Sequence, residues 1–136
     1  MSGIFGAMGI AGTGLTVYRK WLDAVSDNIA NMNNASATNA DAFQARYVVA
    51  QAVDYGGGTE GVQVGGAVLS GKTEGRMVYE PDHPLADENG YVKYPDIDLG
   101  DQMSQLMMAQ RGYQANVAVI ERAKDAYTAA LRLGKG

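Results

Sequence analysis

The chain has 136 residues, contains no cysteine and carries a formal net charge of −4, from 11 basic and 15 acidic side chains. This length suits one ordinary domain, and the lack of cysteine excludes a disulfide framework, a thiolate metal site and a thiol nucleophile. Acidic residues concentrate in the middle, where residues 33–97 hold nine acidic and four basic side chains. Because no basic stripe is present, the composition argues against nucleic acid as a partner.

Residues 1–32 predict an N-terminal axial helix. Apolar side chains recur at steps that alternate between four and three residues, which is the a/d repeat of a helical seam. The seam residues are Ile4, Met8, Ala11, Leu15, Tyr18, Leu22, Val25, Ile29 and Met32. Five glycines fall within residues 1–14, and each costs up to about 1 kcal/mol in a helix relative to alanine. We therefore expect residues 1–14 to be disordered in the free monomer and helical only when packed.

The glycine-rich start also raises the alternative of a membrane-active amphipathic module. Its longest apolar stretch, Gly3 to Gly12, is too short to span a bilayer, and its flanks lack the Lys and Arg expected at an anionic membrane surface. No basic residue precedes Arg19, so the charged region that opens an ordinary signal peptide is also missing. Membrane activity is therefore disfavoured, and any export is expected to proceed without a cleaved signal peptide.

Residues 33–97 predict a polar loop followed by a small β unit. Asparagine, serine and small residues end the first helix near Met32. Turns are expected at Tyr55–Gly58 and at Asn89–Gly90. Before, between and after these turns, β-forming residues predict three or four short strands, over 43–53, 62–69, 77–79 and 91–94. So few short strands make hairpins rather than a large independent core.

Residues 66–73 read GAVLSGKT and match the phosphate-binding loop pattern G-x-x-x-x-G-K-[ST]. A functional loop of this kind needs a helix to begin at its Lys-Thr end, because the helix N-terminus and backbone amides hold the phosphate. The residues that follow, Glu74 to Pro81, contain a glycine, a β-forming run and a proline. The chain also has no room for the parallel βαβ sheet of such sites. A small nucleotide-binding protein is therefore the alternative function, and a hairpin loop is the favoured interpretation.

The remaining candidates for chemistry are weak. His83 is the only histidine and lies between Asp82 and Pro84, where no partner nucleophile is in view. The acidic residues Asp82, Asp87 and Glu88 suggest calcium, but Gly90 is misplaced for an EF-hand loop. We therefore expect no catalytic residue, no cofactor and no metal ion.

Residues 98–136 predict a C-terminal axial helix about 50 Å long, at about 1.5 Å per residue. Asp98 is expected to cap its start, and Arg132 followed by Gly134 is expected to mark its end. The same alternation of four and three defines a second seam. Its residues are Leu99, Met103, Leu106, Gln110, Tyr113, Val117, Ile120, Lys124, Tyr127 and Leu131.

Two such seams predict an α+β fold in which the terminal helices pair as an antiparallel coiled coil, with a small hairpin-rich middle. In this arrangement Met32 lies level with Leu99, and Leu15 lies near Val117. Seam residues are also candidates for an assembly interface, since narrow apolar seams bury themselves against other helices. These candidates are Leu15, Leu22, Ile29, Leu106, Tyr113, Val117, Ile120 and Leu131.

Three stretches resemble one family. Ser26–Asn31 is similar to the S-x-N-[IL]-A-N signature that opens flagellar rod, hook and hook-associated axial proteins. The other stretches resemble the FlgC family of flagellar basal-body proximal rod proteins: Tyr79–Asp87 with Gly90–Lys93, Pro95 and Asp98, and the C-terminal residues Arg111, Tyr113–Asn116 and Leu131–Gly134. Only the loop Asn33–Ala42 departs from the pattern, because it lacks the expected glycine and proline.

The resemblance implies a non-enzymatic subunit of the flagellar rod, which carries torque from the membrane ring to the hook. Its implied partners are copies of itself, other rod proteins, the membrane ring and the export apparatus, with no nucleic acid and no small-molecule substrate. Its implied location is the basal body in the cell envelope, periplasmic in a Gram-negative cell. The matched motifs add four residues to the expected assembly interface: Asn28, Asn31, Gln114 and Asn116.

Overall fold

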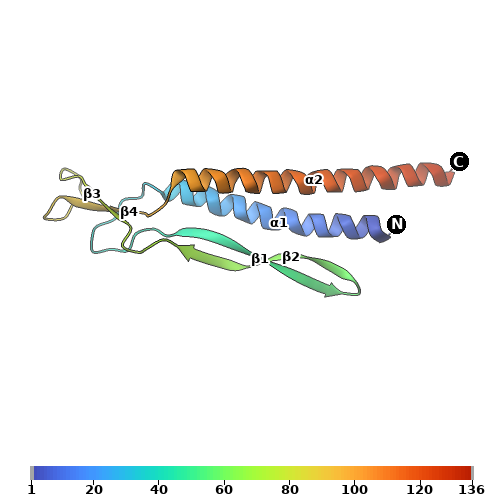
Figure 1. The fold of residues 1–136 in the computed structure, drawn as a ribbon, viewed down its shortest axis with the longest axis horizontal. Helices are drawn as coiled ribbons and strands as arrows, with labels where there is room; N and C mark the ends of the chain where they lie inside the picture. Colours follow the sequence, from blue (N-terminus) through green and yellow to red (C-terminus); the bar gives the residue numbers. More distant parts are fainter. Residues whose placement is uncertain (1, 136) are drawn as a thin grey trace. The chain divides into compact units, whose positions relative to one another are not determined.

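The computed structural model describes residues 2–135 and contains two long helices and two β-hairpins (Figure 1). The described elements, in chain order, are α1 (Ser2–Asn31), β1 (Ala45–Gly56), β2 (Thr59–Ser70), β3 (Arg76–Tyr79), β4 (Tyr91–Tyr94) and α2 (Leu99–Lys135). Strand β1 pairs with β2, and β3 pairs with β4 in a separate two-stranded sheet. The expected α+β fold with long terminal helices is confirmed.

The chain divides into two compact units, and four of the six elements contribute residues to both. Unit 1 combines the residues up to Leu22, the segment Val48–Gly66 and the residues from Met107 onward. Unit 2 combines Asp23–Tyr47 with Ala67–Leu106.

Within unit 1, α1 and α2 run antiparallel. The Phe5 and Tyr127 rings lie 5.3 Å apart between centroids, and the Tyr18 ring lies against Gly112. Residue numbers thus rise along one helix as they fall along the other. Between these two contacts, Gly14 lies against the side chain of Asn116. The expected pairing of Leu15 with Val117 is therefore correct to within one residue on each helix.

The seam itself needs a correction on both helices. On α2, five expected seam residues are exposed: Leu99, Met103, Gln110, Lys124 and Leu131. At every second seam position, the residue that packs inward is the one just before the expected seam residue. These inward residues are Gln102, Ala109, Asn116, Ala123 and Ala130. On α1, Gly14 and Asn28 are buried, whereas Leu15 and Ile29 are half-buried. The reason is steric, because small residues let the two backbones approach closely, as at Gly14 and Gly112.

The glycines of α1 fall into two groups. A Cβ atom added at Gly14 would meet the Asn116 side-chain amide, and one added at Gly112 on α2 would overlap the Tyr18 ring. In contrast, Cβ atoms added at Gly3, Gly6, Gly9 or Gly12 would meet nothing within 4 Å. Close packing of the helices therefore requires Gly14 and Gly112, but not the first four glycines.

The β1–β2 hairpin in unit 1 contacts α1 through Thr13. The Thr13 hydroxyl accepts a hydrogen bond from the Val62 backbone N–H at 3.1 Å and donates one to the Ile10 carbonyl at 2.7 Å. The hairpin turns at Gly56, Gly57 and Gly58, whose φ angles of 82°, 64° and 80° lie in the left-handed region that favours glycine. The expected turn is therefore confirmed.

The last turn of α2 extends past the start of α1. Because Phe5 contacts Tyr127 in the antiparallel pair, the residues after Ala130 lie beyond Ser2, where α1 begins. Residues 131–135 are all exposed and helical, with Leu133 84% exposed. The expectation that Gly134 ends the helix is wrong, because α2 continues through it to Lys135.

Unit 2 contains the β3–β4 hairpin and the loop that follows α1. β3 and β4 pair antiparallel, with Val78 opposite Val92. Lys93 on β4 is nearly buried and holds the 33–42 loop: its backbone pairs with Ser36 in both directions, and its ammonium group donates to the Ala40 carbonyl at 2.6 Å. These bonds supply the order that glycine and proline do not provide in this loop.

The start of α2 is capped as expected. The Asp98 carboxylate accepts hydrogen bonds from the backbone N–H groups of Gly100 at 2.7 Å and Asp101 at 3.3 Å. These amides have no partner inside the helix, so an aspartate here stabilises the first turn.

Candidate functional site

A buried polar node joins three elements of unit 2, and Asn28 of α1 lies at its centre. The Asn28 side-chain oxygen accepts from the Arg46 backbone N–H at 2.8 Å, and its Nδ2 donates to the Arg46 carbonyl at 3.0 Å. The side chain thus pairs with β1 as a neighbouring strand would. Asn28 is 0% exposed, so an amide left without these partners would cost about 1–3 kcal/mol.

Gln102 of α2 completes the polar node and is only 1% exposed. Its Oε1 accepts from Asn28 Nδ2 at 2.9 Å, and its Nε2 donates to the Tyr47 hydroxyl at 3.1 Å. That hydroxyl in turn donates to the Asp101 carboxylate at 3.3 Å. Among the described residues, no buried side-chain nitrogen or oxygen lacks a hydrogen-bond partner, so the polar node is fully satisfied.

Burial raises the pKa of Tyr47 above its ordinary value. The hydrogen bond from Gln102 acts in the opposite direction, while the negative charge of Asp101 raises the pKa further. The Tyr47 hydroxyl therefore stays protonated and keeps donating to Asp101 well into the alkaline range.

Sequence reasoning found Asn28 through its motif but missed Gln102 and Tyr47. Neither residue belongs to an apolar repeat, and a buried glutamine leaves no periodic signal. One available signal was the position of Gln102, one turn after the Asp98 cap and one residue before an expected seam position. The polar node shows why Asn28 cannot be an ordinary seam residue, since its amide pairs with backbone.

The expected assembly residues differ in how much surface they offer. Asn28 offers none, while Gln114 and Leu131 are exposed. The others are half-buried: Leu15, Leu22, Ile29, Asn31, Leu106, Tyr113, Asn116, Val117 and Ile120. Of these, Asn31 donates its side-chain amide to the Asp27 carbonyl of its own helix at 2.8 Å. Their contribution to an interface stays a prediction.

Unit 1 leaves many large apolar side chains in contact with solvent. On the helices these are Phe5, Ile10, Met107, Met108, Val119, Leu131 and Leu133, and on the hairpin Val49, Tyr55 and Val64. Each is at least 38% exposed. Unit 2 also exposes large apolar side chains, among them Leu69 at 57% and Tyr79 at 63%. Both units thus leave more apolar surface in contact with solvent than a few scattered residues would.

The candidate phosphate-binding loop has the wrong structure. Residues 66–70 lie in strand β2, and a turn around Gly71 and Gly75 leads directly into β3. No helix begins after Lys72, so the amide cradle and the helix N-terminus that hold phosphate are missing there. The 66–73 segment is not the expected hairpin loop either, because it consists of the end of β2 and the first residues of the connection to β3, and these two strands do not pair with each other.

The acidic turn between β3 and β4 is ordered by hydrogen bonds. The Asp87 carboxylate accepts from the backbone N–H groups of Asn89 and Tyr91, both at 2.9 Å. The hydrogen bond from Tyr91, with others from Asn89, Thr38 and Gly90, lowers the pKa of Asp87. Among residues 2–135, no group of three histidine, aspartate or glutamate side chains could hold a metal ion.

Comparison with known proteins first gives the class. Residues 88–133 match the family described as the flagellar basal body rod FlgEFG protein C-terminal. These residues cover β4 and nearly all of α2. The long C-terminal helix is therefore of the kind found in flagellar rod proteins.

Full-length comparison then gives the family. The chain is 39% identical over 128 residues to the flagellar basal-body rod protein FlgC of Salmonella typhimurium, covering 93% of this chain and 94% of that protein. It is 30% identical to FlgC of Borreliella burgdorferi over 152 aligned positions, 98% and 99% of the two chains. It is 27% identical to FlgC of Bacillus subtilis over 148 aligned positions, 96% and 98%. The chain belongs to the FlgC family of flagellar basal-body rod proteins.

Proposed function

We propose that this chain is a structural, non-enzymatic subunit of the flagellar rod. It assembles with copies of itself and with other rod proteins, and it takes part in passing torque from the membrane ring to the hook. It reaches the basal body through the flagellar export apparatus without a cleaved signal peptide. The membrane ring and the export apparatus are therefore partners as well.

The observation that carries this proposal is the exposed apolar surface of the chain, which both units share. A 136-residue chain that remained alone in water would be expected to bury side chains such as Met107, Met108 and Leu133, which are 52%, 49% and 84% exposed. Burying apolar surface is worth about 25 cal/mol per Å², so association with other chains is favoured. Neither helix among the described residues is long and apolar enough to cross a membrane.

Deleting the gene in its own bacterium and imaging purified basal bodies tests the proposal. We expect rods to be absent or truncated, and an epitope-tagged copy of the chain to restore them and to be found in them. Intact rods in the deletion strain, or a tagged chain missing from restored rods, would contradict the proposal.

Lys72→Ala provides the matched control. Lys72 is exposed and lies in the turn before β3. In the deletion strain, the Lys72→Ala chain should therefore restore rods and motility as well as the wild-type chain does. A folded Lys72→Ala chain that fails to restore motility, together with ATP binding by the wild type, would favour the nucleotide-binding alternative.

A further inference from the structure

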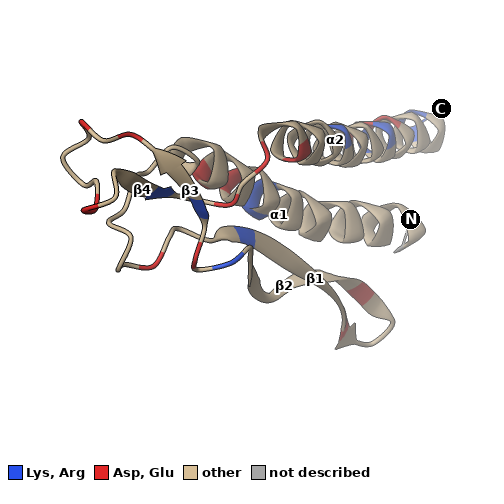
Figure 2. Cartoon of the chain, turned by 60° about the vertical axis from the view of Figure 1, so that its left-hand side comes forward, with Lys and Arg blue, Asp and Glu red and all other residues tan. Residues whose placement is uncertain are grey.

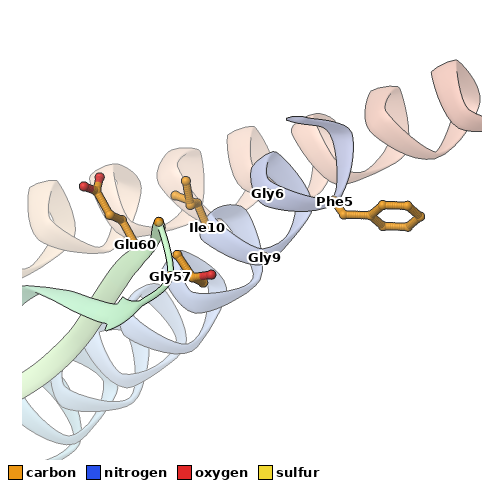
Figure 3. Close-up of a pocket in the computed structure, with 8 residues that line it drawn as sticks. Phe5, Gly6, Gly9, Ile10, Gly57 and Glu60 are labelled. Carbon is orange, nitrogen blue, oxygen red and sulfur yellow. The ribbon is translucent and has the colours of Figure 1, made fainter. Parts of the chain in front are cut away.

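In unit 1, the start of α1 and the tip of the β1–β2 hairpin border a cavity of about 410 Å³ (Figure 3). It is lined by Phe5, Gly6, Gly9, Ile10 and residues 57–60. A cavity of about 150 Å³ is enough to hold benzene. This one therefore has room for an aliphatic side chain and part of the segment that carries it.

On the α1 side of this cavity, two of the lining residues are glycines, which have no side chain to fill the space. Gly6 and Gly9 are helical residues over which an added Cβ would meet nothing within 4 Å, and Ile10 beside them is 48% exposed. Each glycine costs up to about 1 kcal/mol in a helix, and no contact within unit 1 needs it. The space over the two glycines is thus available to a group from outside the chain.

The parts of α1 and of the hairpin that border the cavity carry few charged side chains, and those few are acidic. Residues 2–18 carry no charged side chain, and the hairpin segment 48–66 carries only Asp54 and Glu60 (Figure 2). Glu60 itself lines the cavity, and in Figure 3 its side chain and that of Ile10 extend to the same side.

The last turns of α2 have the complementary properties. Residues 126–135 carry two basic side chains, Arg132 and Lys135, and Asp125 borders the same shallow hollow as Arg132 and Leu133. They also carry Leu131 and Leu133, 44% and 84% exposed, on the helical turn that extends past the start of α1. An apolar anchor that carries Arg132 beside it fits a cavity that is lined by Ile10 and by one carboxylate, Glu60.

We propose that the C-terminal turn of α2 in one copy of this chain inserts Leu133 into the α1–hairpin cavity of a second copy, with Arg132 facing Glu60. Both complementary surfaces belong to the same chain, so the occupant that we propose is a second copy of it. The contact joins two different surfaces and is heterologous, so it propagates into an open row of subunits if it does not close. The inference rests on the proposed function and adds a specific contact to it.

Cysteine cross-linking in assembled rods tests this contact, since the native chain has no cysteine. One tagged copy carries Thr59→Cys and a second, differently tagged copy carries Leu133→Cys. A disulfide requires Cα atoms within about 7 Å, so oxidation should produce a covalent dimer that contains both tags. A single chain with both substitutions should produce a ladder of longer multimers.

Val119→Cys is the matched control, because Val119 is an apolar α2 residue that is also exposed, at 40%. Paired with Thr59→Cys, it should give no dimer. If rods contain both Cys variants but no mixed dimer forms, the inference is overturned while the proposed function stands. A cross-link from Thr59→Cys to a different rod protein would also overturn it. Absence of the chain from rods would instead count against the proposed function.

A charge exchange provides an independent readout. Glu60→Arg places two positive groups together and should lower incorporation into rods at least about tenfold, which corresponds to about 1.4 kcal/mol. Adding Arg132→Glu to the same chain should restore most of the incorporation. Glu74→Arg, an equal charge change at an exposed residue of unit 2, should have no effect. Equal incorporation of Glu60→Arg and wild type, or no recovery in the double variant, would contradict the contact.

Discussion

The side chain of Asn28 makes the pair of backbone hydrogen bonds that a residue of a neighbouring strand would make. Its amide offers one donor group and one acceptor, as a peptide unit does, and both engage Arg46 of β1. The same Nδ2 also reaches Gln102 of α2. One residue therefore connects the end of a helix, the start of a hairpin and the start of the second helix, all inside unit 2.

Asn28→Asp separates the acceptor from the donor. The carboxylate can still accept from the Arg46 N–H, but it places negative charge against the Arg46 carbonyl and Gln102 Oε1. We expect the free energy of unfolding to fall by about 2–4 kcal/mol, measured by urea denaturation of the purified chain followed by circular dichroism. Asn33→Asp, at an exposed loop position, should change it by less than about 0.5 kcal/mol. Equal midpoints for the two variants would show that the polar node contributes no stability.

Because the pKa of Tyr47 is raised in the folded chain, we expect the free energy of unfolding to fall at alkaline pH. Its raised pKa means that the folded chain keeps a proton that the unfolded chain loses near its ordinary pKa of 10.0. The stabilisation is fully present below about pH 10 and is lost as pH rises through the raised pKa. Tyr94, whose pKa is raised by its hydrogen bond to Glu80, acts in the same direction, so single variants must be compared.

The measurement is the difference in free energy of unfolding between wild type and Tyr47→Phe from pH 8 to pH 11. We expect this difference to be constant up to about pH 10 and then to fall. Tyr94→Phe serves as the companion variant for the second tyrosine. A difference that rises with pH would show that the sign of the Tyr47 shift is wrong.

Among the elements, the sequence predicted the helices well and their faces less well. The apolar repeats placed both helices and their antiparallel direction, because a long repeat needs a partner of equal length. The inward face differs by one residue at alternate positions because alanine, glycine, asparagine and glutamine form the close contact. Hydrophobic periodicity gives such residues little weight, whereas steric fit at Gly14 and Gly112 depends on them.

The β elements show a similar division. The β1–β2 turn was predicted from its glycines, whose backbone preferences are local, whereas Asn89–Gly90 forms only the end of the loop 80–90 that joins β3 to β4. Strand β2, in contrast, runs unbroken from Thr59 to Ser70 through the Gly65–Gly66 pair. Pairing with β1 maintains that length, and pairing is a non-local property that local propensity does not contain. Gln102 and Tyr47 were missed for the same reason, since their roles depend on residues far away in the sequence.

Two glycine-to-alanine substitutions should change stability in opposite directions. Gly112→Ala would overlap the Tyr18 ring, and we expect it to lower the free energy of unfolding by about 1–2 kcal/mol, because overpacking outweighs the gain in helix propensity. Gly9→Ala has open space and, where residues 1–14 are helical as in α1, should raise it by up to about 1 kcal/mol; no change would show that this stretch is disordered in the free chain. Thermal denaturation of the two purified variants provides the measurement. Equal shifts in the same direction would show that close helix contact does not explain Gly112.

The same Gly9→Ala variant separates stability from assembly. Its methyl group would project into the space beside Ile10, where the Leu133 anchor is proposed to enter. We therefore expect a more stable chain that is incorporated into rods less well than wild type. Gly3→Ala, at an open position outside the cavity lining, should gain stability without this loss.

For the whole molecule, family membership and the exposed surface point the same way. The chain matches FlgC proteins over nearly its full length, and in the part that the structure describes every buried side-chain nitrogen and oxygen has a hydrogen-bond partner. Large apolar side chains remain exposed in both units, for example Leu133 in unit 1 and Tyr79 in unit 2. Under the proposed function, neighbouring subunits of the rod bury them.

The turn of α2 that continues past the start of α1 gives a row of subunits a direction. Each copy presents a cavity at one contact and a protruding helix end at the other, so the two ends of a growing row are chemically different. A copy that lacks residues 131–136 keeps its cavity but has no anchor to place in the next subunit. At low levels beside the wild type, such a copy should act as a chain terminator and reduce motility, whereas a copy with Glu60→Arg added should be excluded and harmless.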